Sequence, residues 1–303
     1  MGVPFLLLLL VLAVSPAFLV QGMRVPLART PADLGISDFE EVEFTAGDEP
    51  ITLRGWWFPV AAAKGAVVLV HGGGDNRASA HAGLIELARD LRGRGYASLA
   101  FDMRNHGLSD SSASGTPSFG PTEANDVIAA VGFVATRLPG VPVAAIGFSM
   151  GGNAVLYAAV KEPRLAAVVT VATYARLSSI LPNAVGASAG APAFLMHPII
   201  WSAEAFYGLP VSWAGAEDIA PRLAPGVLLL IHDEADPIVP VEHAKRLSAL
   251  APEAKHWITT PLPDDHPLMV EAGRWGSHSR TYVLHPEEFV DRVTAHFAAR
   301  MRK

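Results

Sequence analysis

The chain has 303 residues, half of them hydrophobic and 17% charged, so it can bury a large core and is not extensively disordered. Its formal net charge of −6 argues against a nucleic acid as partner. The absence of cysteine excludes disulfide bonds, thiolate metal sites and cysteine nucleophiles.

The chain opens with a long apolar segment. Residues 3–20 carry no charged side chain, and the first basic residue is Arg24. Such a run is just long enough to cross a bilayer and also fits a secretory signal, whereas a buried core helix is a poorer match. We therefore expect residues 1–22 to form a hydrophobic helix that is a membrane anchor or a signal segment. Residues 23–40 are expected to be a linker.

The side of the membrane follows less directly from the sequence. Arg24 and Arg29 flank the apolar segment on its C-terminal side, and the positive-inside rule would keep them in the cytoplasm. Two arginines are a weak signal, however, and N-terminal segments of this kind more often direct export. We expect a membrane-associated protein whose catalytic domain lies outside the cytoplasm; secretion after cleavage of the segment is the alternative.

Beyond the linker, strand patterns alternate with helical patterns. Residues 41–45 and 51–58 are expected to form an antiparallel hairpin, because a turn-like segment separates them. Further strands are expected over residues 66–70, 97–102, 141–146, 167–171, 226–231 and 255–260, and helices over 78–94, 122–137, 153–160 and from 286 onward. The alternation predicts an α/β domain over residues 41–303, with a mostly parallel sheet and helices on both faces.

The most informative motif is GFSMGG at residues 147–152, between an expected strand and an expected helix. Strand, G-x-S-x-G and helix is the arrangement of a nucleophile elbow. Gly147 and Gly151 would let the strand and the helix approach closely, and the helix N-terminus would favour negative charge near the serine. The motif predicts Ser149 as a nucleophile. A glycine-rich turn with an uninvolved serine is the alternative.

Three motifs in this order resemble the α/β-hydrolase superfamily: HGGG at residues 71–74, FDMRNHGLS at 101–109, and GFSMGG. Within it the chain is most similar to bacterial esterases and lysophospholipase-like serine hydrolases, from about residue 41 to the C-terminus. The motifs are specific for fold and nucleophile but not for substrate. The resemblance implies the α/β-hydrolase fold with a short helical cap, which we expect at about residues 174–225.

The resemblance also implies an acid after the serine. Where the family has H-G-x-x-D-x-x-V-P after a strand, this chain has HDEADPIVP, which places Asp236 as the acid. Asp233 stands at the position of the family's usual glycine, so it is the alternative acid. The acid would hold the histidine in one tautomer and stabilise its protonated form.

Two histidines compete for the role of base. The resembled hydrolases have G-x-H, an aromatic residue four positions on, and P-E-E-[FY] at the start of the last helix. His278, Tyr282 and residues 286–289 reproduce this spacing, so His278 is preferred and His266 is the alternative. The other histidines, His81 among them, are expected at the surface or in packing.

The resemblance implies a mechanism as well. Ser149 would attack a carbonyl while His278 removes its proton, and water would release the acyl-enzyme. The backbone amides of Met150 and Gly73 would bind the oxyanion. His71 is expected to be a structural loop residue. The sequence has no metal-binding or dinucleotide-binding pattern, so we expect no cofactor and no metal.

Apolar residues between 174 and 225 favour a pocket for an apolar acyl or alcohol group, although they would also pack the cap onto the core. We therefore predict a serine hydrolase that cleaves carboxylic esters of small, lipid-like molecules. A thioesterase or acyltransferase with the same triad is one alternative, and a non-catalytic membrane-tethered binding module is another. The sequence leaves the acyl-chain length and the oligomeric state open.

Overall fold

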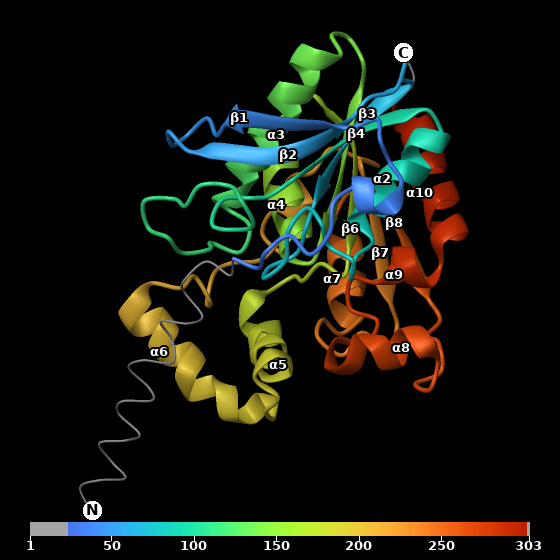
Figure 1. The fold of residues 1–303 in the computed structure, drawn as a ribbon. Helices are drawn as coiled ribbons and strands as arrows, with labels where there is room; N and C mark the ends of the chain where they lie inside the picture. Colours follow the sequence, from blue (N-terminus) through green and yellow to red (C-terminus); the bar gives the residue numbers. More distant parts are fainter. Residues whose placement is uncertain (1–23, 302–303) are drawn as a thin grey trace, which may run out of the picture.

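A computed structural model describes residues 24–301 (Figure 1). The hydrophobic helix and the anchor or signal segment expected for residues 1–22 lie outside the described residues. Eight strands form one sheet in the order β1-β2-β4-β3-β5-β6-β7-β8. Their bounds are Glu40–Thr45 (β1), Thr52–Phe58 (β2), Gly65–Val70 (β3), Tyr96–Phe101 (β4), Val143–Phe148 (β5), Leu165–Val171 (β6), Leu228–Asp233 (β7) and Lys255–Thr259 (β8).

The strand directions agree with the predicted hairpin and parallel sheet. β1 pairs antiparallel with β2, and β2 pairs antiparallel with β4. Every other pairing, from β4–β3 through β7–β8, is parallel. A parallel sheet buries both faces, which explains why β3, β4 and β5 are buried along their whole length and consist almost entirely of apolar residues.

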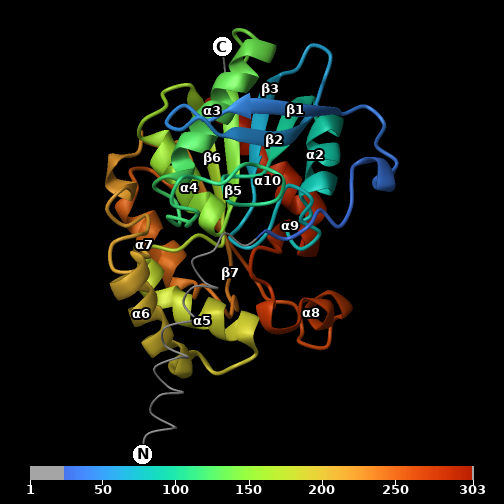
Figure 2. The same cartoon turned by 60° about the vertical axis from the view of Figure 1, so that its left-hand side comes forward.

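Helices cover both faces of the sheet. Their bounds are Leu84–Gly93 (α2), Glu123–Arg137 (α3), Met150–Ala159 (α4), Leu177–Ala189 (α5), His197–Tyr207 (α6), Glu242–Leu250 (α7), Pro267–Ala272 (α8), Thr281–Leu284 (α9) and Pro286–Arg300 (α10). Apolar residues of α3, α4 and α7 belong to the core on one face, and those of α2, α9 and α10 to the core on the other. Figure 2 shows the same division from the side.

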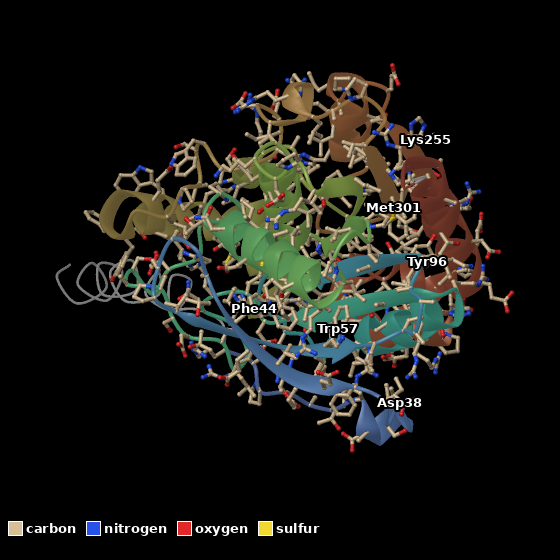
Figure 3. The ribbon with its side chains drawn as sticks, turned by 90° about the horizontal axis from the view of Figure 1, so that it is seen from above. Asp38, Phe44, Trp57, Tyr96, Lys255 and Met301 are labelled. Carbon is tan, nitrogen blue, oxygen red and sulfur yellow. The ribbon has the colours of Figure 1, made fainter. Side chains whose placement is uncertain are left out.

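The side-chain alternation of the strands divides the core in two. Trp56 packs in one core and Trp57 in the other, as expected for neighbours on a strand. Phe44 and Trp57, labelled in Figure 3, lie against Phe133 of α3 with ring centroids 5.2 and 6.5 Å away. These aromatic contacts fix the hairpin on the α3 side of the sheet.

The interval between β6 and β7 leaves the alternation of strands and helices, where we expected the cap. It contains α5, the 3₁₀ turn η2 (Ala193–Met196), α6 and the 3₁₀ turn η3 (Ala220–Arg222). Figures 1 and 2 show α5 and α6 at one end of the molecule, away from the β1–β2 hairpin. None of the described helices alone is long and apolar enough to cross a membrane. Taken together, α5 and residues 193–207 are long and apolar enough to cross a membrane, but the two segments are bent by 104° relative to each other.

The segment expected as a linker is held on the domain surface. It contains the 3₁₀ turn η1 (Ala32–Leu34). Arg29 donates to the carbonyls of Ala78 and Ser79 at 3.1 and 3.0 Å and forms an ion pair with Glu86. These contacts, spread along α2 and the loop before it, fix the path of the chain before β1.

Candidate active site

Ser149 lies in a strained turn between β5 and α4. Its backbone has φ 50° and ψ −115°, a conformation that non-glycine residues rarely adopt and that costs about 1–3 kcal/mol. A Cβ at Gly147 would lie closer than 3.0 Å to the carbonyl of Gly151, and one at Gly151 equally close to the carbonyl of His71. Only glycine at these two positions allows β5, the HGGG loop and α4 to approach so closely.

The serine hydroxyl belongs to a three-residue hydrogen-bond chain. Its Oγ lies 3.0 Å from Nε2 of His278, whose Nδ1 lies 2.8 Å from Oδ2 and 3.1 Å from Oδ1 of Asp236. His278 and Asp236 are buried. Because a carboxylate can only accept, Nδ1 carries the proton and Nε2 is left to accept the serine proton. The structure thus brings together the three residues that the sequence singled out.

The carboxylate of Asp236 is fixed by its own loop. Its Oδ1 accepts from the amides of Ile238 and Val239, both at 2.9 Å. Burial by itself raises the pKa of Asp236, but the attraction and hydrogen bonds of His278 outweigh it, so the pKa lies below the usual 3.8. The acid is therefore ionised when it orients the imidazole.

The residues expected to bind an oxyanion lie beside the serine. Met150 is the first residue of α4, and Gly73 contributes to the wall of the same cavity. A Cβ at Gly73 would be 3.4 Å from Sδ of Met150, so the HGGG loop contacts the start of the helix. Within residues 24–301 neither amide donates to a described hydrogen bond. Their role in oxyanion binding stays a prediction.

Comparisons with known proteins agree with this fold. The family model described as "Serine aminopeptidase, S33" matches residues 61–200. The uncharacterized protein YfhR of Salmonella typhi is 30% identical over 262 residues, which cover 84% of this chain and 82% of that protein. The esterase Pf2001 of Pyrococcus furiosus has a TM-score of 0.72 at 25% identity, covering 94% of this chain and 99% of its own. The chain belongs to the α/β-hydrolase superfamily.

Asp233, the alternative acid of this α/β hydrolase, lies at the end of β7 and does not contact His278. Its Oδ1 accepts from the hydroxyl of Ser277, and its Oδ2 from that of Thr259, both at 2.8 Å. Ser277, which precedes His278, is thereby linked through Asp233 to strands β7 and β8. The carboxylate that replaces the family's usual glycine acts on the histidine loop, not on the imidazole.

His266, the alternative base, lies apart from the serine. It is the N-cap residue of α8, and its Nδ1 accepts from the amide of Leu268 at 3.3 Å. The segment that carries it continues into the 3₁₀ turn η4 (Gly273–Trp275), where Trp275 packs against His278 with ring centroids 5.8 Å apart. The segment thus contributes an aromatic wall beside the base.

Two further histidines support the site. His71 is buried; its Nδ1–H donates to the carbonyl of Gly72 at 2.7 Å, and its Nε2 accepts from the amide of Met103 at 3.0 Å. Burial lowers its pKa, so it is a neutral structural residue, as expected. His81, expected at the surface or in packing, instead lines the cavity and donates from Nε2 to the carbonyl of His278 at 2.6 Å. Nothing in its sequence surroundings indicates this contact.

A buried ion pair between Arg77 and Asp102 fixes the loop that continues from HGGG, and the sequence did not predict it. Arg77 Nη1 lies 2.7 Å from Oδ2 of Asp102, and the amide of Arg77 donates to Oδ1 of the same carboxylate at 2.8 Å. The amide of Leu108 also donates to Asp102, at 2.9 Å. Asp102 therefore joins the loops after β3 and β4. Its place in the FDMRNHGLS motif is the only sequence signal for this role.

A cavity of about 500 Å³ opens above the serine. Ser149, His278 and the HGGG loop form its polar part. The remaining walls are mainly apolar and include Phe119, Phe148, Tyr174, Ile180, Leu181, Ala184, Val185, Leu209, Ile238 and Trp275. Four of these residues come from α5. The cap helix thus covers the nucleophile with an apolar surface.

Proposed function

We propose that this hydrolase cleaves carboxylic esters with apolar acyl chains through an acyl-enzyme on Ser149. The observation that carries the proposal is the hydrogen-bond chain from Ser149 through His278 to Asp236, at 3.0 and 2.8 Å. A serine hydroxyl is a weak nucleophile unless a base within hydrogen-bond reach takes its proton. The imidazole of His278 lies within this reach, and the carboxylate of Asp236 lies beside it, which supports the proposal.

The reaction then has two halves. Ser149 Oγ forms a bond to the ester carbonyl carbon while its proton moves to Nε2 of His278, and Asp236 stabilises the imidazolium. The imidazolium returns the proton to the leaving alcohol as the C–O bond breaks. Water repeats the sequence: it gives a proton to His278, attacks the acyl carbon and releases the acid, with the proton returning to Ser149. The amides of Gly73 and Met150 would bind the oxyanion in both halves, each worth about 3 kcal/mol.

The cavity supports an apolar acyl group as the recognised part. Its size lies within the range of about 300–1,000 Å³ usual for small-molecule sites. Each methylene moved from water onto the α5 wall contributes about 0.8 kcal/mol. Where that contact is kept in the transition state, kcat/KM rises about fourfold per methylene until the cavity is filled.

A series of p-nitrophenyl esters from acetate to palmitate tests this function. The proposal expects kcat/KM to rise through the short chains and to level off, with Ser149→Ala inactive throughout. Flat values across the series would contradict an apolar acyl pocket. Faster acyl transfer to added alcohols or thiols than to water would instead indicate an acyltransferase, and binding without turnover a non-catalytic module.

We also propose that residues 3–20 hold the protein at a membrane, with the catalytic domain outside the cytoplasm. Support comes from the length and the uncharged composition of the segment. Fractionation of cells that express the full chain, or a version starting at Met23, tests the anchor. The full chain is expected in membranes and the shorter chain in the soluble fraction. Both in the soluble fraction at full length would contradict the anchor, and a shortened soluble product would indicate a cleaved signal.

A further inference from the structure

Large exposed apolar side chains are concentrated in one stretch of the cap. Within residues 24–301, seven large apolar side chains are more than half exposed, and five of these lie between residues 194 and 213. We call these five the cap face: Phe194 (70% exposed), Leu195 (51%), Trp201 (62%), Phe206 (71%) and Trp213 (61%). Scattered apolar residues are normal on a protein surface, but clusters mark sites of interaction.

Helix α6 shows why this surface is unusual. One side of the helix is buried through Ile200 and Ala203, as in any helix packed on a domain. Trp201 and Phe206 of the same helix are exposed, and their rings meet edge to face at 6.0 Å. A helix that exposes large apolar side chains in addition to those it buries is typical of a position between a protein core and a second apolar environment.

The charge distribution indicates what that environment is. Residues 177–213 contain one charged side chain, Glu204, in a chain that is 17% charged overall. The carboxylate of Glu204 accepts from the amide of Ser212 at 2.8 Å. This stretch thus offers few of the charged side chains that are usual in the rim of a protein–protein interface. A bilayer interface favours such a surface, because the rings of tryptophan and phenylalanine insert at the boundary between headgroups and acyl chains.

The path of the chain places this surface toward the membrane. Arg24 donates to the carbonyl of Gly107 at 3.0 Å in the loop after β4, and Asn76, in the loop after β3, donates to the carbonyl of Val25 at 2.9 Å. Both loops follow the carboxyl ends of parallel strands, as does the cap after β6. Four chain steps separate residue 20 from Arg24 and span at most about 14 Å. An inserted apolar segment therefore holds the cap end of the domain close to the lipid.

We propose that the cap face is a membrane-docking surface, which lies in the headgroup region of the bilayer beside the N-terminal anchor. Ile180, Leu181 and Ala184 of α5 line the catalytic cavity, and α5 packs against α6. Docking thus places the cavity roof at the lipid, so that a hydrophobic ester passes from the bilayer to Ser149 with little exposure to water. What enters the cavity rests on the proposed function, whereas the docking itself does not.

The natural absence of cysteine makes a direct test available, because one introduced cysteine is labelled alone. Full-length Phe206→Cys, carrying an environment-sensitive nitrobenzoxadiazole label, is reconstituted into phosphatidylcholine vesicles with or without a doxyl-labelled phosphatidylcholine. The matched control is Glu287→Cys, at an exposed position on α10. Docking predicts that the fluorescence emission of the label at 206 moves to shorter wavelength and that the doxyl lipid quenches at least about half of its intensity. The label at 287 is expected to show neither change.

Two results would overturn the proposal. A label at 206 that stays unshifted and unquenched lies in water. A label whose emission shifts without quenching is covered by protein, either a second copy of the chain or its own residues 3–20.

A further variant adds a functional readout. Phe206→Glu is expected to keep its rate of hydrolysis of soluble p-nitrophenyl acetate, and its rate on a long-chain ester embedded in the same vesicles is expected to fall severalfold. If the wild type hydrolysed neither ester, the proposed function would fail, while the fluorescence result would still decide the docking.

Discussion

Replacement of Asp236 by asparagine isolates the role of the acid. Oδ2 of Asp236 accepts from Nδ1–H of His278 at 2.8 Å, and the amides of Ile238 and Val239 hold its Oδ1. In Asp236→Asn those two amides keep the carbonyl oxygen, so the NH₂ group faces Nδ1. The imidazole then takes the tautomer with a proton on Nε2 and cannot accept the proton of Ser149. In serine proteases this change costs about 10⁴ in kcat, or about 5.5 kcal/mol.

Asp233→Asn is the matched control, since Asp233 is also a buried carboxylate but bonds to Ser277, the neighbour of the histidine, and not to the imidazole. The asparagine carbonyl can still accept from Ser277, and its NH₂ can donate to Thr259, so the loss in kcat is expected to stay within about tenfold. Initial rates on p-nitrophenyl butyrate, with thermal unfolding to verify folding, measure both variants. Equal losses would refute the assignment of Asp236 as the single acid.

Three more predictions follow from the geometry. His278→Ala is expected to lose as much activity as Ser149→Ala, while His266→Ala keeps most of it; initial rates would show the reverse pattern if the base were misassigned. Gly151→Ala is expected to abolish activity or soluble expression, because its Cβ would overlap the backbone after β3; a folded, fully active variant would contradict the elbow geometry. Burial, with a smaller effect of the neighbouring His71, lowers the pKa of His106 to about 4 from 6.5. The unfolded chain therefore takes up a proton that the folded chain refuses, so stability is complete above pH 6.5 and is lost as pH falls toward 4. The unfolding temperature in detergent is expected to fall between about pH 7.5 and 5, and an unchanged value would count against a buried neutral histidine.

The strand–helix alternation predicted most of the fold because the parallel strands are buried on both faces and therefore consist of continuous apolar runs. β3 and β4 begin and end within one residue of their expected bounds. The helix expected over residues 78–94 begins only at Leu84, because Gly83 before it is left-handed, with φ 68°, and lies close against the ring of Tyr282. Such long-range contacts leave no periodic pattern in the sequence.

The candidate site was predictable where local motifs carry the geometry. Ser149 needs a specific turn, and that turn needs glycines at fixed spacing. Asp233, His81 and Trp275 gain their places beside the histidine from loops that are distant in sequence, so only the folded chain shows them. The two histidine candidates were separated by the resemblance, since no physical property of the sequence alone distinguishes a loop histidine that caps a helix from one that faces a serine.

We expect Ser149 to form a covalent acyl-enzyme. Incubation of the full-length protein with a fluorophosphonate probe, followed by digestion and mass spectrometry, tests it most directly, because only an activated serine reacts with such a probe. One adduct per chain is expected, on the peptide that contains Ser149, and none in Ser149→Ala. Ester hydrolysis without an adduct, or with the adduct on another residue, would contradict it.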